Sequence, residues 1–130
     1  MSRVQLAINV TDLEAAIRFY SRLFGAEPAK RRPGYANFVV DDPPLKLVLI
    51  EGADRGGTLN HLGVEVADPV EVDRAAARLA GEGLVTDEER GVTCCHAVQD
   101  KVWVRDPDGA PWEVYTVLAD AATAGEPACC

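Results

Sequence analysis

The sequence lacks a surplus of basic residues, a long apolar segment and an N-terminal signal. It has 13 Lys and Arg against 21 Asp and Glu, so its formal net charge of -8 repels phosphate backbones and anionic lipid. No segment approaches the roughly 18 apolar residues of a membrane span, and the first residues lack a basic region followed by an apolar stretch. We therefore expect a cytoplasmic protein without nucleic-acid or membrane partners, whose thiols stay reduced.

A length of 130 residues and a hydrophobic content of 48% fit one globular domain. The chain contains an internal repeat. A shift of 56 residues aligns Gln5 with His61, Leu6 with Leu62, Val10 with Val66, Asp12 with Asp68 and Gly25 with Gly81. We predict one domain over 1–118, made of module one (1–51), a glycine-rich linker (52–58) and module two (59–118). Residues 119–130 are predicted to be a flexible tail that ends in cysteines.

The sequence pattern in each copy of the repeat predicts a strand, a helix and three further strands. The first strands cover 5–10 and 61–66, and an amphipathic helix follows each, capped by Asp12 or Asp68 and ending near Gly25 or Gly81. The later strands of the first copy cover about 29–32, 35–40 and 45–50. Those of the second copy cover about 85–89, 97–105 and 111–118.

Strand alternation groups the polar side chains on particular faces. Gln5, Ala7 and Asn9 share one face, and the same holds for His61, Gly63 and Glu65, and for Glu113, Tyr115 and Val117. The opposite faces, 6-8-10, 62-64-66 and 112-114, are apolar and are predicted to be core. Gln5, His61 and Glu113 would point into one cavity if the two halves curl together.

Paired βαβββ modules with a His opening the second module and a Glu in "DPDGAPWEVY" resemble the vicinal-oxygen-chelate superfamily of glyoxalases, ring-cleaving dioxygenases and antibiotic-resistance proteins. The resemblance implies an α+β fold in which the modules form a U-shaped sheet, or cup, with a divalent metal at its mouth. It implies Gln5, His61 and Glu113 as the metal ligands. A strand glutamine that bonds a neighbouring backbone group is the alternative for Gln5.

Lys46 falls opposite Glu113 when the closing strands are aligned with a shift of 67 residues. A protonated lysine is no metal ligand, so only three protein ligands remain where a glyoxalase would supply a second carboxylate. Three ligands leave coordination positions open for dioxygen and substrate, as in non-heme iron oxygenases. This pattern favours an oxygenase over a glyoxalase.

The difference between the two shifts gives the second copy 11 extra residues, which we place in a long loop at about 88–100. This loop contains Cys94 and Cys95. Adjacent cysteines rarely pair with each other, because the ring that they would close is strained. Their thiolates can converge on one soft centre such as zinc, cadmium or trivalent arsenic. The alternative is that both are inert.

The segments "LNHLGVEV", "TCCHAVQDKVWV" and "PWEVYTVLAD" are similar to arsenical carbon-arsenic lyases and actinobacterial cadmium-induced proteins, a branch of the same superfamily. That family uses ferrous iron, Fe(II), and dioxygen to remove the organic group of trivalent organoarsenicals. The resemblance implies that Cys94 and Cys95 bind the methyl or aromatic arsenical as a dithiolate. Arsenite and an oxidised carbon fragment would then be released.

Further residues are accessory candidates. His96 is an extra soft-metal donor, a base for the thiols or a solvent-facing spectator, and Cys129-Cys130 is a second thiol trap or a tail without a role. Trp103, Tyr115 and Lys46 are candidates to line the cup, although packing is the more frequent use of a tryptophan.

Two other functions compete with the lyase. One is a non-catalytic protein of this fold that binds cadmium or arsenic, and the other is a different oxygenase or isomerase in which the cysteines are incidental. The sequence leaves open whether the two halves pair within one chain or across a homodimer, which is common for this fold.

Overall fold

The computed structural model describes residues 2–52 and 54–125, which contain two helices and eight strands. They form two compact units, Arg3–His61 and a second unit that begins at Leu62. The boundary falls inside strand β5 (Leu59–Glu65), so that His61 belongs to the first unit. Each unit has its own helix and its own hydrophobic core.

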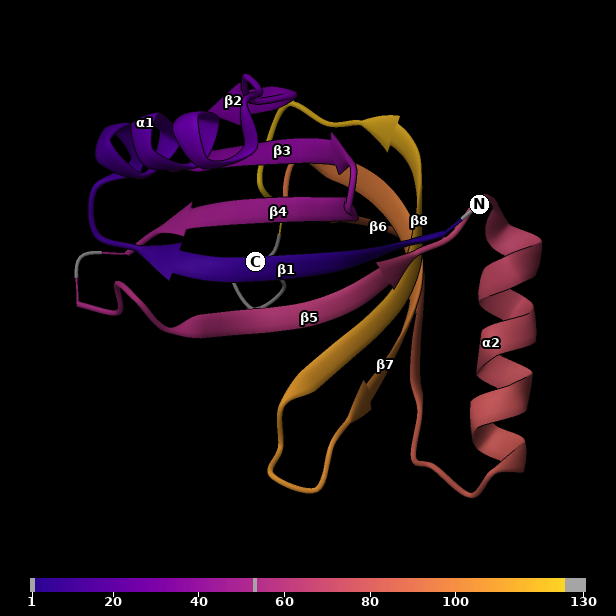
Figure 1. Ribbon diagram of the computed structural model, residues 1–130. Coiled ribbons are helices and arrows are strands. Elements are labelled where there is room, and N and C mark those ends of the chain that lie inside the picture. The colour runs from indigo at the N-terminus through magenta and orange to yellow at the C-terminus, as the bar shows by residue number, and fades with distance from the viewer. Residues whose placement is uncertain (1, 53, 126–130) are drawn as a thin grey trace. The chain divides into compact units, whose positions relative to one another are not determined.

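The first unit has the element order that the repeat predicts (Figure 1). It contains β1 (Arg3–Val10), α1 (Leu13–Phe24), β2 (Lys30–Arg32), β3 (Tyr35–Asp41) and β4 (Pro44–Glu51). Its strands lie in the order β2-β3-β4-β1, and β1 runs parallel to β4 while the other pairs are antiparallel. The predicted linker pairs with the end of β1, because Asn9 exchanges backbone hydrogen bonds with Gly57 and Thr58.

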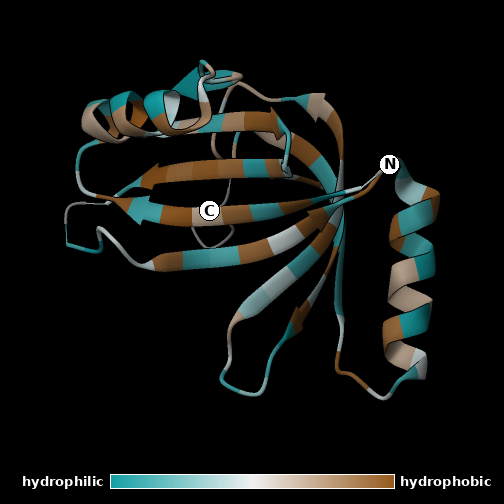
Figure 2. Cartoon of the chain, viewed as in Figure 1, coloured by the Kyte–Doolittle hydropathy of each residue, from teal (hydrophilic) through white to brown (hydrophobic). Residues whose placement is uncertain are grey.

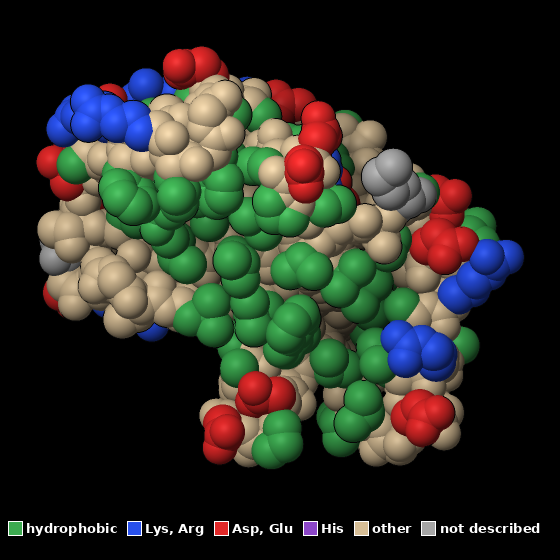
Figure 3. All heavy atoms as spheres, viewed as in Figure 1, with side chains coloured by type: hydrophobic (Ala, Val, Ile, Leu, Met, Phe, Trp, Pro, Cys, Tyr) green, Lys and Arg blue, Asp and Glu red, His purple; other side chains and the backbone are tan. Residues whose placement is uncertain are grey.

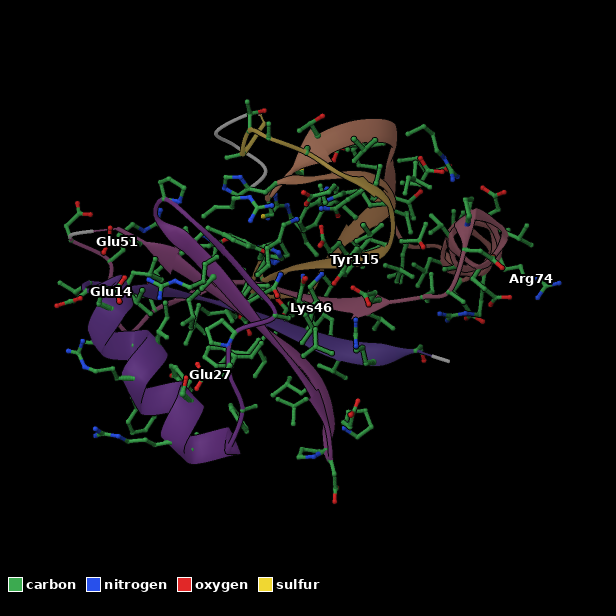
Figure 4. All side chains as sticks on the ribbon, turned by 90° about the horizontal axis from the view of Figure 1, so that it is seen from above. Glu14, Glu27, Lys46, Glu51, Arg74 and Tyr115 are labelled. Carbon is green, nitrogen blue, oxygen red and sulfur yellow. The ribbon has the colours of Figure 1, made fainter. Side chains whose placement is uncertain are left out.

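Helix α1 begins and ends at the residues that the sequence indicates. The Asp12 side chain accepts a hydrogen bond from the backbone N–H of Ala15, and Gly25 ends the helix in the left-handed conformation at φ 62°. Glu51 adds a second cap by accepting from the N–H of Leu13, and Figure 4 shows Glu51 and Glu14 near the start of the helix. Leu13 and Ile17 pack against the apolar face of β1, β3 and β4.

The second unit holds the rest of β5 and four further elements. These are α2 (Pro69–Gly81), β6 (Asp87–Cys94), β7 (Ala97–Arg105) and β8 (Pro111–Asp120). The strand order is β5-β8-β7-β6, with β5 parallel to β8 and the other pairs antiparallel. Asp68 caps α2 by accepting from Glu71, and Pro69 occupies the first helical turn.

The core of each unit lies between its helix and one sheet face. In the second unit Val72, Ala76 and Leu79 of α2 pack against Val102, with Val66 and Val114 beside them. Figure 2 shows hydrophilic and hydrophobic residues alternating along the strands. The predicted core face is confirmed for Leu6, Ile8 and Val10 in the first unit and for Val66 and Val114 in the second.

The predicted long loop at 88–100 is wrong. Strands β6 and β7 run through it and are joined by a two-residue turn, Cys95-His96. Strand β6 has eight residues where its counterpart β2 has three, so much of the extra length continues a β-hairpin instead of forming a loop. Backbone groups are satisfied more completely in a ladder than in a loop, which favours the hairpin.

Strand β8 is two residues longer than predicted and ends at Asp120. The residues that follow, up to Gly125, return to the β6–β7 hairpin: the backbone N–H of Ala121 donates to the carbonyl of His96, and Gly125 forms a bridge with Cys94. We call residues 121–125 the C-terminal strap.

Several large apolar side chains reach the surface, among them Phe19 and Leu23 of α1, Val70 of α2, and Val117 and Leu118 of β8. Figure 3 shows hydrophobic side chains exposed among charged ones on the face that it draws. Such exposure is ordinary for a globular surface. In the described residues no helix has the length and apolarity needed to span a membrane.

Candidate functional site

Gln5 and His61 lie together in the first unit. Both are almost fully buried, with exposed fractions of 4% and 3%, and the Gln5 Nε2 lies 3.2 Å from the His61 Nε2. Strand parity therefore brings these two predicted ligands together. A polar pair buried in this way must be hydrogen-bonded or bind an ion.

The other nitrogen of His61 is held by Asn60, a residue that the sequence reading did not select. Asn60 Oδ1 lies 2.7 Å from His61 Nδ1, and its Nδ2 donates to Asn9 Oδ1 at 3.0 Å. Since that bond fixes the Asn60 amide, Nδ1 carries the imidazole proton and the Nε2 lone pair faces Gln5. Metal-binding histidines are oriented in this way by a second hydrogen bond on the far nitrogen.

Lys46 lies next to Gln5 across the β1–β4 pair and is half-buried. It is not, however, the counterpart of Glu113. In the second unit Glu113 pairs with Gly63, and the repeat partner of Gly63 is Ala7, which pairs with Val48. The first module thus has an apolar residue where the second has its carboxylate, because the β1–β4 register differs by two residues from that predicted.

Glu113 is 2% exposed and belongs to the second unit, where it accepts a hydrogen bond from Lys101. The Lys101 Nζ lies 2.8 Å from Glu113 Oε2, and Lys101 itself is 1% exposed. Burying a carboxylate is costly unless a cation compensates it, and Lys101 supplies that charge. The sequence reading missed Lys101, although its alternation with Trp103 on β7 was a usable signal.

Polar pairs extend along the same face of β5, β8, β7 and β6. Tyr115, labelled in Figure 4, donates its hydroxyl to Glu65 Oε2 at 3.1 Å, and Trp103 Nε1 donates to Glu89 at 2.7 Å. The Lys101 ammonium lies 5.2 Å from the Trp103 ring and 6.0 Å from that of Tyr115. Both aromatic candidates therefore surround the lysine that holds Glu113.

Cys95 and His96 form the hairpin turn with φ values of 49° and 63°. Left-handed conformations at both positions are typical of a type I′ turn, which is normally built from Asn and Gly. The side chains found here pay a steric cost at both positions. His96 is 7% exposed, so the option of a solvent-facing spectator is wrong.

Cys94 and Cys95 are both disulfide-bonded in the structure, against the prediction of reduced thiols. Cys94 is buried, and its carbonyl accepts from Gln99 Nε2 at 2.8 Å. A sulfur in a disulfide has no thiolate with which to bind a soft ion, so the dithiol predicted from the sequence is the reduced form of this site. Cys129 and Cys130 lie outside the described residues.

Cys94 and Glu113 share one face of the sheet in the second unit. Cys94 pairs with Ala97 and Glu113 with Trp103, and Ala97 and Trp103 lie on the same side of β7. Six positions along a strand correspond to about 20 Å. The cysteine pair and the carboxylate are thus aligned on one surface but not adjacent.

The hairpin changes register between these two points. Residues Arg90 and Gly91 interrupt the β6–β7 ladder, Gly91 has φ 61°, and its N–H donates to Asp100 Oδ1 at 2.8 Å. Arg90 is paired with Glu88 and Asp73. The hydrogen bond that Arg90 donates to Glu88, together with the nearby carboxylates of Asp73 and Asp100, raises the pKa of Arg90. The hairpin end, residues 92–99, therefore lies beyond a bulge that is fixed by ion pairs.

Residues 3–114 match the family described as the glyoxalase/bleomycin resistance protein/dioxygenase superfamily. The chain belongs to this superfamily. Homoprotocatechuate 2,3-dioxygenase from Arthrobacter globiformis has a similar structure, with a TM-score of 0.62 and 24% identity over 92% of this chain and 37% of that one. This likeness concerns the fold, and it confirms the predicted vicinal-oxygen-chelate class.

Two relatives are much closer in sequence. The cadmium-induced protein CadI of Mycobacterium tuberculosis (strain ATCC 25618 / H37Rv) is 69% identical over 125 residues, 96% of this chain and 82% of the relative. A trivalent organoarsenical cleaving enzyme of Thermomonospora curvata is 63% identical over 134 aligned positions, covering 100% of this chain and 89% of that protein. The branch of the superfamily that the sequence resembles is thereby confirmed.

Among the described residues, no group of three or more His, Cys, Asp or Glu side chains is arranged so that it could hold a metal ion. The predicted ligand set has one histidine, one carboxylate and one amide, and such a set suits a divalent ion that prefers nitrogen and oxygen donors. A buried imidazole with an oriented lone pair and a buried, charge-compensated carboxylate are the features that fit this ion.

Proposed function

We propose that the protein cleaves the carbon-arsenic bond of trivalent organoarsenicals and releases arsenite, with Fe(II) as its cofactor and dioxygen as a reactant. The observation that carries this proposal is the 63% identity, over the whole chain, to a protein named a trivalent organoarsenical cleaving enzyme. The vicinal cysteines at the hairpin turn supply the chemistry that such a substrate requires.

The substrate site is the reduced pair Cys94-Cys95. A methylarsonous or aromatic arsenical carries two hydroxides that two thiols displace as water, and arsenic then holds two sulfurs at the hairpin turn. A pentavalent arsenical has no such thiol-exchangeable centre. The pair therefore selects the oxidation state of the substrate.

The metal ligands are Gln5, His61 and Glu113. The Nε2 lone pair of His61 is oriented for coordination by Asn60, and the Gln5 amide turns its oxygen toward the ion once it no longer donates to His61. Glu113 adds one negative charge, which Lys101 balances when the ion is absent. Bound Fe(II) would supply the activation of dioxygen.

Transfer of the arsenical from the cysteines to Glu113, which lies farther along the same face of the second unit, requires the hairpin end to move. Residues 92–99 carry the cysteines and lie beyond the interruption at Arg90 and Gly91. Trp103 and Tyr115 lie farther along the same face of the sheet and offer an aromatic surface for the organic group. In this proposal the hairpin turn binds arsenic, and the face of β7 and β8 orients the organic group of the substrate.

The experiment starts from reduced protein loaded anaerobically with ferrous iron. Methylarsonous acid is added, air is admitted and the arsenic species are separated. Arsenite is expected only with iron, air and intact Cys94 and Cys95. Arsenite formation by Cys94→Ser/Cys95→Ser at the wild-type rate would exclude the cysteines as the substrate site, and Glu113→Ala should bind the arsenical without cleaving it.

A second candidate is stoichiometric binding of cadmium or arsenic without turnover. The 69% identity to a protein named cadmium-induced favours it. The test incubates the wild-type protein with methylarsenical, iron and air, and then releases the bound arsenic with excess dithiol. Recovery of intact methylarsenical would favour this binding function over the lyase.

A further inference from the structure

Gln99 lies beside the cysteine pair, on the face of β7 that also carries Ala97 and Lys101. Cys94 pairs with Ala97 across the β6–β7 ladder, so Gln99, two positions farther along β7, is the diagonal neighbour of Cys94. Diagonal neighbours on one face of a sheet are about 7–8 Å apart, which a long side chain can span. Gln99 does so, because its Nε2 donates to the Cys94 carbonyl at 2.8 Å.

The oxygen of the Gln99 amide is buried without a protein partner. The bond to Cys94 fixes which end of the amide is the donor, and Oε1 has no hydrogen-bond partner in the part of the chain that the structure describes. Gln99 as a whole is 4% exposed. Buried amide oxygens nearly always accept a hydrogen bond, since an unpaired one destabilises the folded protein. The amide therefore offers an acceptor suited to a bound molecule, next to the proposed substrate site.

Capture of the substrate by two thiols proceeds in two substitutions. The first thiol displaces one hydroxide of methylarsonous acid, and its proton leaves with that hydroxide as water. The adduct then has one arsenic–sulfur bond and one arsenic hydroxyl. The second thiol displaces this hydroxyl, again as water and with no change of oxidation state. The one-thiol adduct thus has a hydroxyl proton to donate while its arsenic is already attached to a cysteine.

We propose that Gln99 Oε1 accepts a hydrogen bond from the hydroxyl of the one-thiol adduct and holds its arsenic beside the second cysteine until the dithiolate closes. The hydrogen bond makes the arsenic-bound oxygen more basic, which helps it to take the proton of the second thiol and leave as water. Gln99 is a positioning residue for substrate capture in the reduced chain. The inference rests on the proposed function for the substrate and its site, but its test requires neither iron nor turnover.

The hydrogen bond exists only in the adduct, so its loss changes the rate of capture and not the final affinity. The completed dithiolate has no hydroxyl, and capture and hydrolysis both pass through the same adduct. A residue that merely supported the turn would instead alter the affinity, or would act on every methylarsenical equally. These differences separate substrate positioning from a structural role.

The test uses full-length, iron-free protein under nitrogen, with Cys129→Ser/Cys130→Ser as the parent so that Cys94 and Cys95 are its only cysteines. A phosphine and water reduce the disulfide to thiols, with formation of phosphine oxide, and excess phosphine is removed. One ligand is methylarsonous acid. The other is methylarsenic carrying two small monothiolates, which gives the same final dithiolate but has no hydroxyl on arsenic at any step. Quenching with a maleimide and protein mass spectrometry give the capture rates, and competition with a small dithiol gives the affinities.

Gln99→Met removes the acceptor and keeps the length of the side chain. We expect it to capture methylarsonous acid about 3- to 10-fold more slowly than the parent, with an affinity within about twofold. It should capture the bis-thiolate at the parent rate. Gln99→Glu retains an acceptor oxygen, and should capture methylarsonous acid faster than Gln99→Met does.

Gly125→Ala is the matched control, because it disturbs the support of the turn without changing Gln99. Gly125 of the C-terminal strap forms a bridge with Cys94, and a Cβ there would lie 1.8 Å from the Thr93 carbonyl oxygen. This substitution should affect the two methylarsenicals equally, so that the ratio of their capture rates stays at the parent value.

Equal capture of methylarsonous acid by the parent and Gln99→Met overturns the proposal. Equal slowing of both methylarsenicals in Gln99→Met also overturns it, and leaves Gln99 as a support of the turn. Loss of methylarsenical binding in Cys94→Ser/Cys95→Ser supports the substrate site of the proposed function. Binding that persists in that variant contradicts the substrate site itself, whatever the result with Gln99→Met.

Discussion

At the residue scale, the polar groups of the candidate site are held by partners that the sequence does not reveal. Asn60 orients His61 and Lys101 compensates Glu113, and neither residue was selected from the sequence. The strand faces of Gln5, His61 and Glu113 followed from parity within a repeat, and the family resemblance implied them as metal ligands. Their partners depend on rotamers and cross-strand register, which parity does not determine.

Lys101→Met leaves the Glu113 carboxylate buried without its cation. In the iron-free, reduced protein we expect the free energy of unfolding to fall by about 3–5 kcal/mol, measured by urea denaturation. Lys101→Met/Glu113→Gln should recover most of this loss. The control is Arg74→Met, which removes the exposed pair with Glu71 and should cost less than about 0.5 kcal/mol. Equal losses for Lys101→Met and Arg74→Met would contradict the assignment.

Asn60→Ala removes the hydrogen bond between Asn60 Oδ1 and His61 Nδ1, so the imidazole ring of His61 is held less firmly in its orientation. We expect the affinity for ferrous iron to fall about 10- to 100-fold, measured by anaerobic titration, with fold retained by circular dichroism. Asn37→Ala is the control, because Asn37 donates to the Tyr35 hydroxyl in the same unit. An unchanged iron affinity in Asn60→Ala would show that His61 is not a ligand oriented by Asn60.

At the element scale, the elements were predictable and one connection was not. Caps at Asp12, Gly25 and Asp68 and the alternation of the strands predicted both helices and the position of every strand except β6, of which only the first residues were predicted. The end of β6 and the turn that joins it to β7 were predicted as a loop. The turn is Cys95-His96, and neither residue is typical of a two-residue turn. Only the cross-strand ladder shows that this segment continues the sheet.

The strain of that turn gives a prediction for the reduced protein. Cys95→Asn and Cys95→Ser both remove the thiol, but Asn tolerates the left-handed conformation better than Ser. We expect Cys95→Asn to be more stable than Cys95→Ser by about 1 kcal/mol in urea denaturation. Equal stabilities, or a more stable serine variant, would mean that the turn is not left-handed at Cys95 in solution.

At the scale of the whole molecule, the proposed function makes arsenic binding depend on the redox state of Cys94 and Cys95. The sequence predicted reduced thiols from the expected compartment, while the structure has Cys94 and Cys95 in disulfides. Composition constrains the compartment but not the pairing of sulfurs in a particular fold. In the proposed function only the reduced form has the thiols that bind the arsenical.

We expect the oxidised chain to bind no methylarsonous acid and a phosphine-reduced sample of the same protein to bind one equivalent. Gel filtration with arsenic quantification measures both. Alkylated protein serves as the control, because its sulfurs stay blocked after reductant is added. Equal binding by oxidised and reduced chains would place the arsenical away from the cysteines.

The central claim is tested most directly by following dioxygen and arsenic in one reaction. Reduced protein carrying ferrous iron is mixed with methylarsonous acid in buffer of known dioxygen content, and arsenite and dioxygen are measured together over time. The account predicts that arsenite appears in step with dioxygen loss in the wild type. The variant Cys94→Ser/Cys95→Ser should neither form arsenite nor consume dioxygen. Methylarsenical that stays intact while bound to the wild type would contradict it, and would leave a protein that captures soft toxic ions without cleaving them.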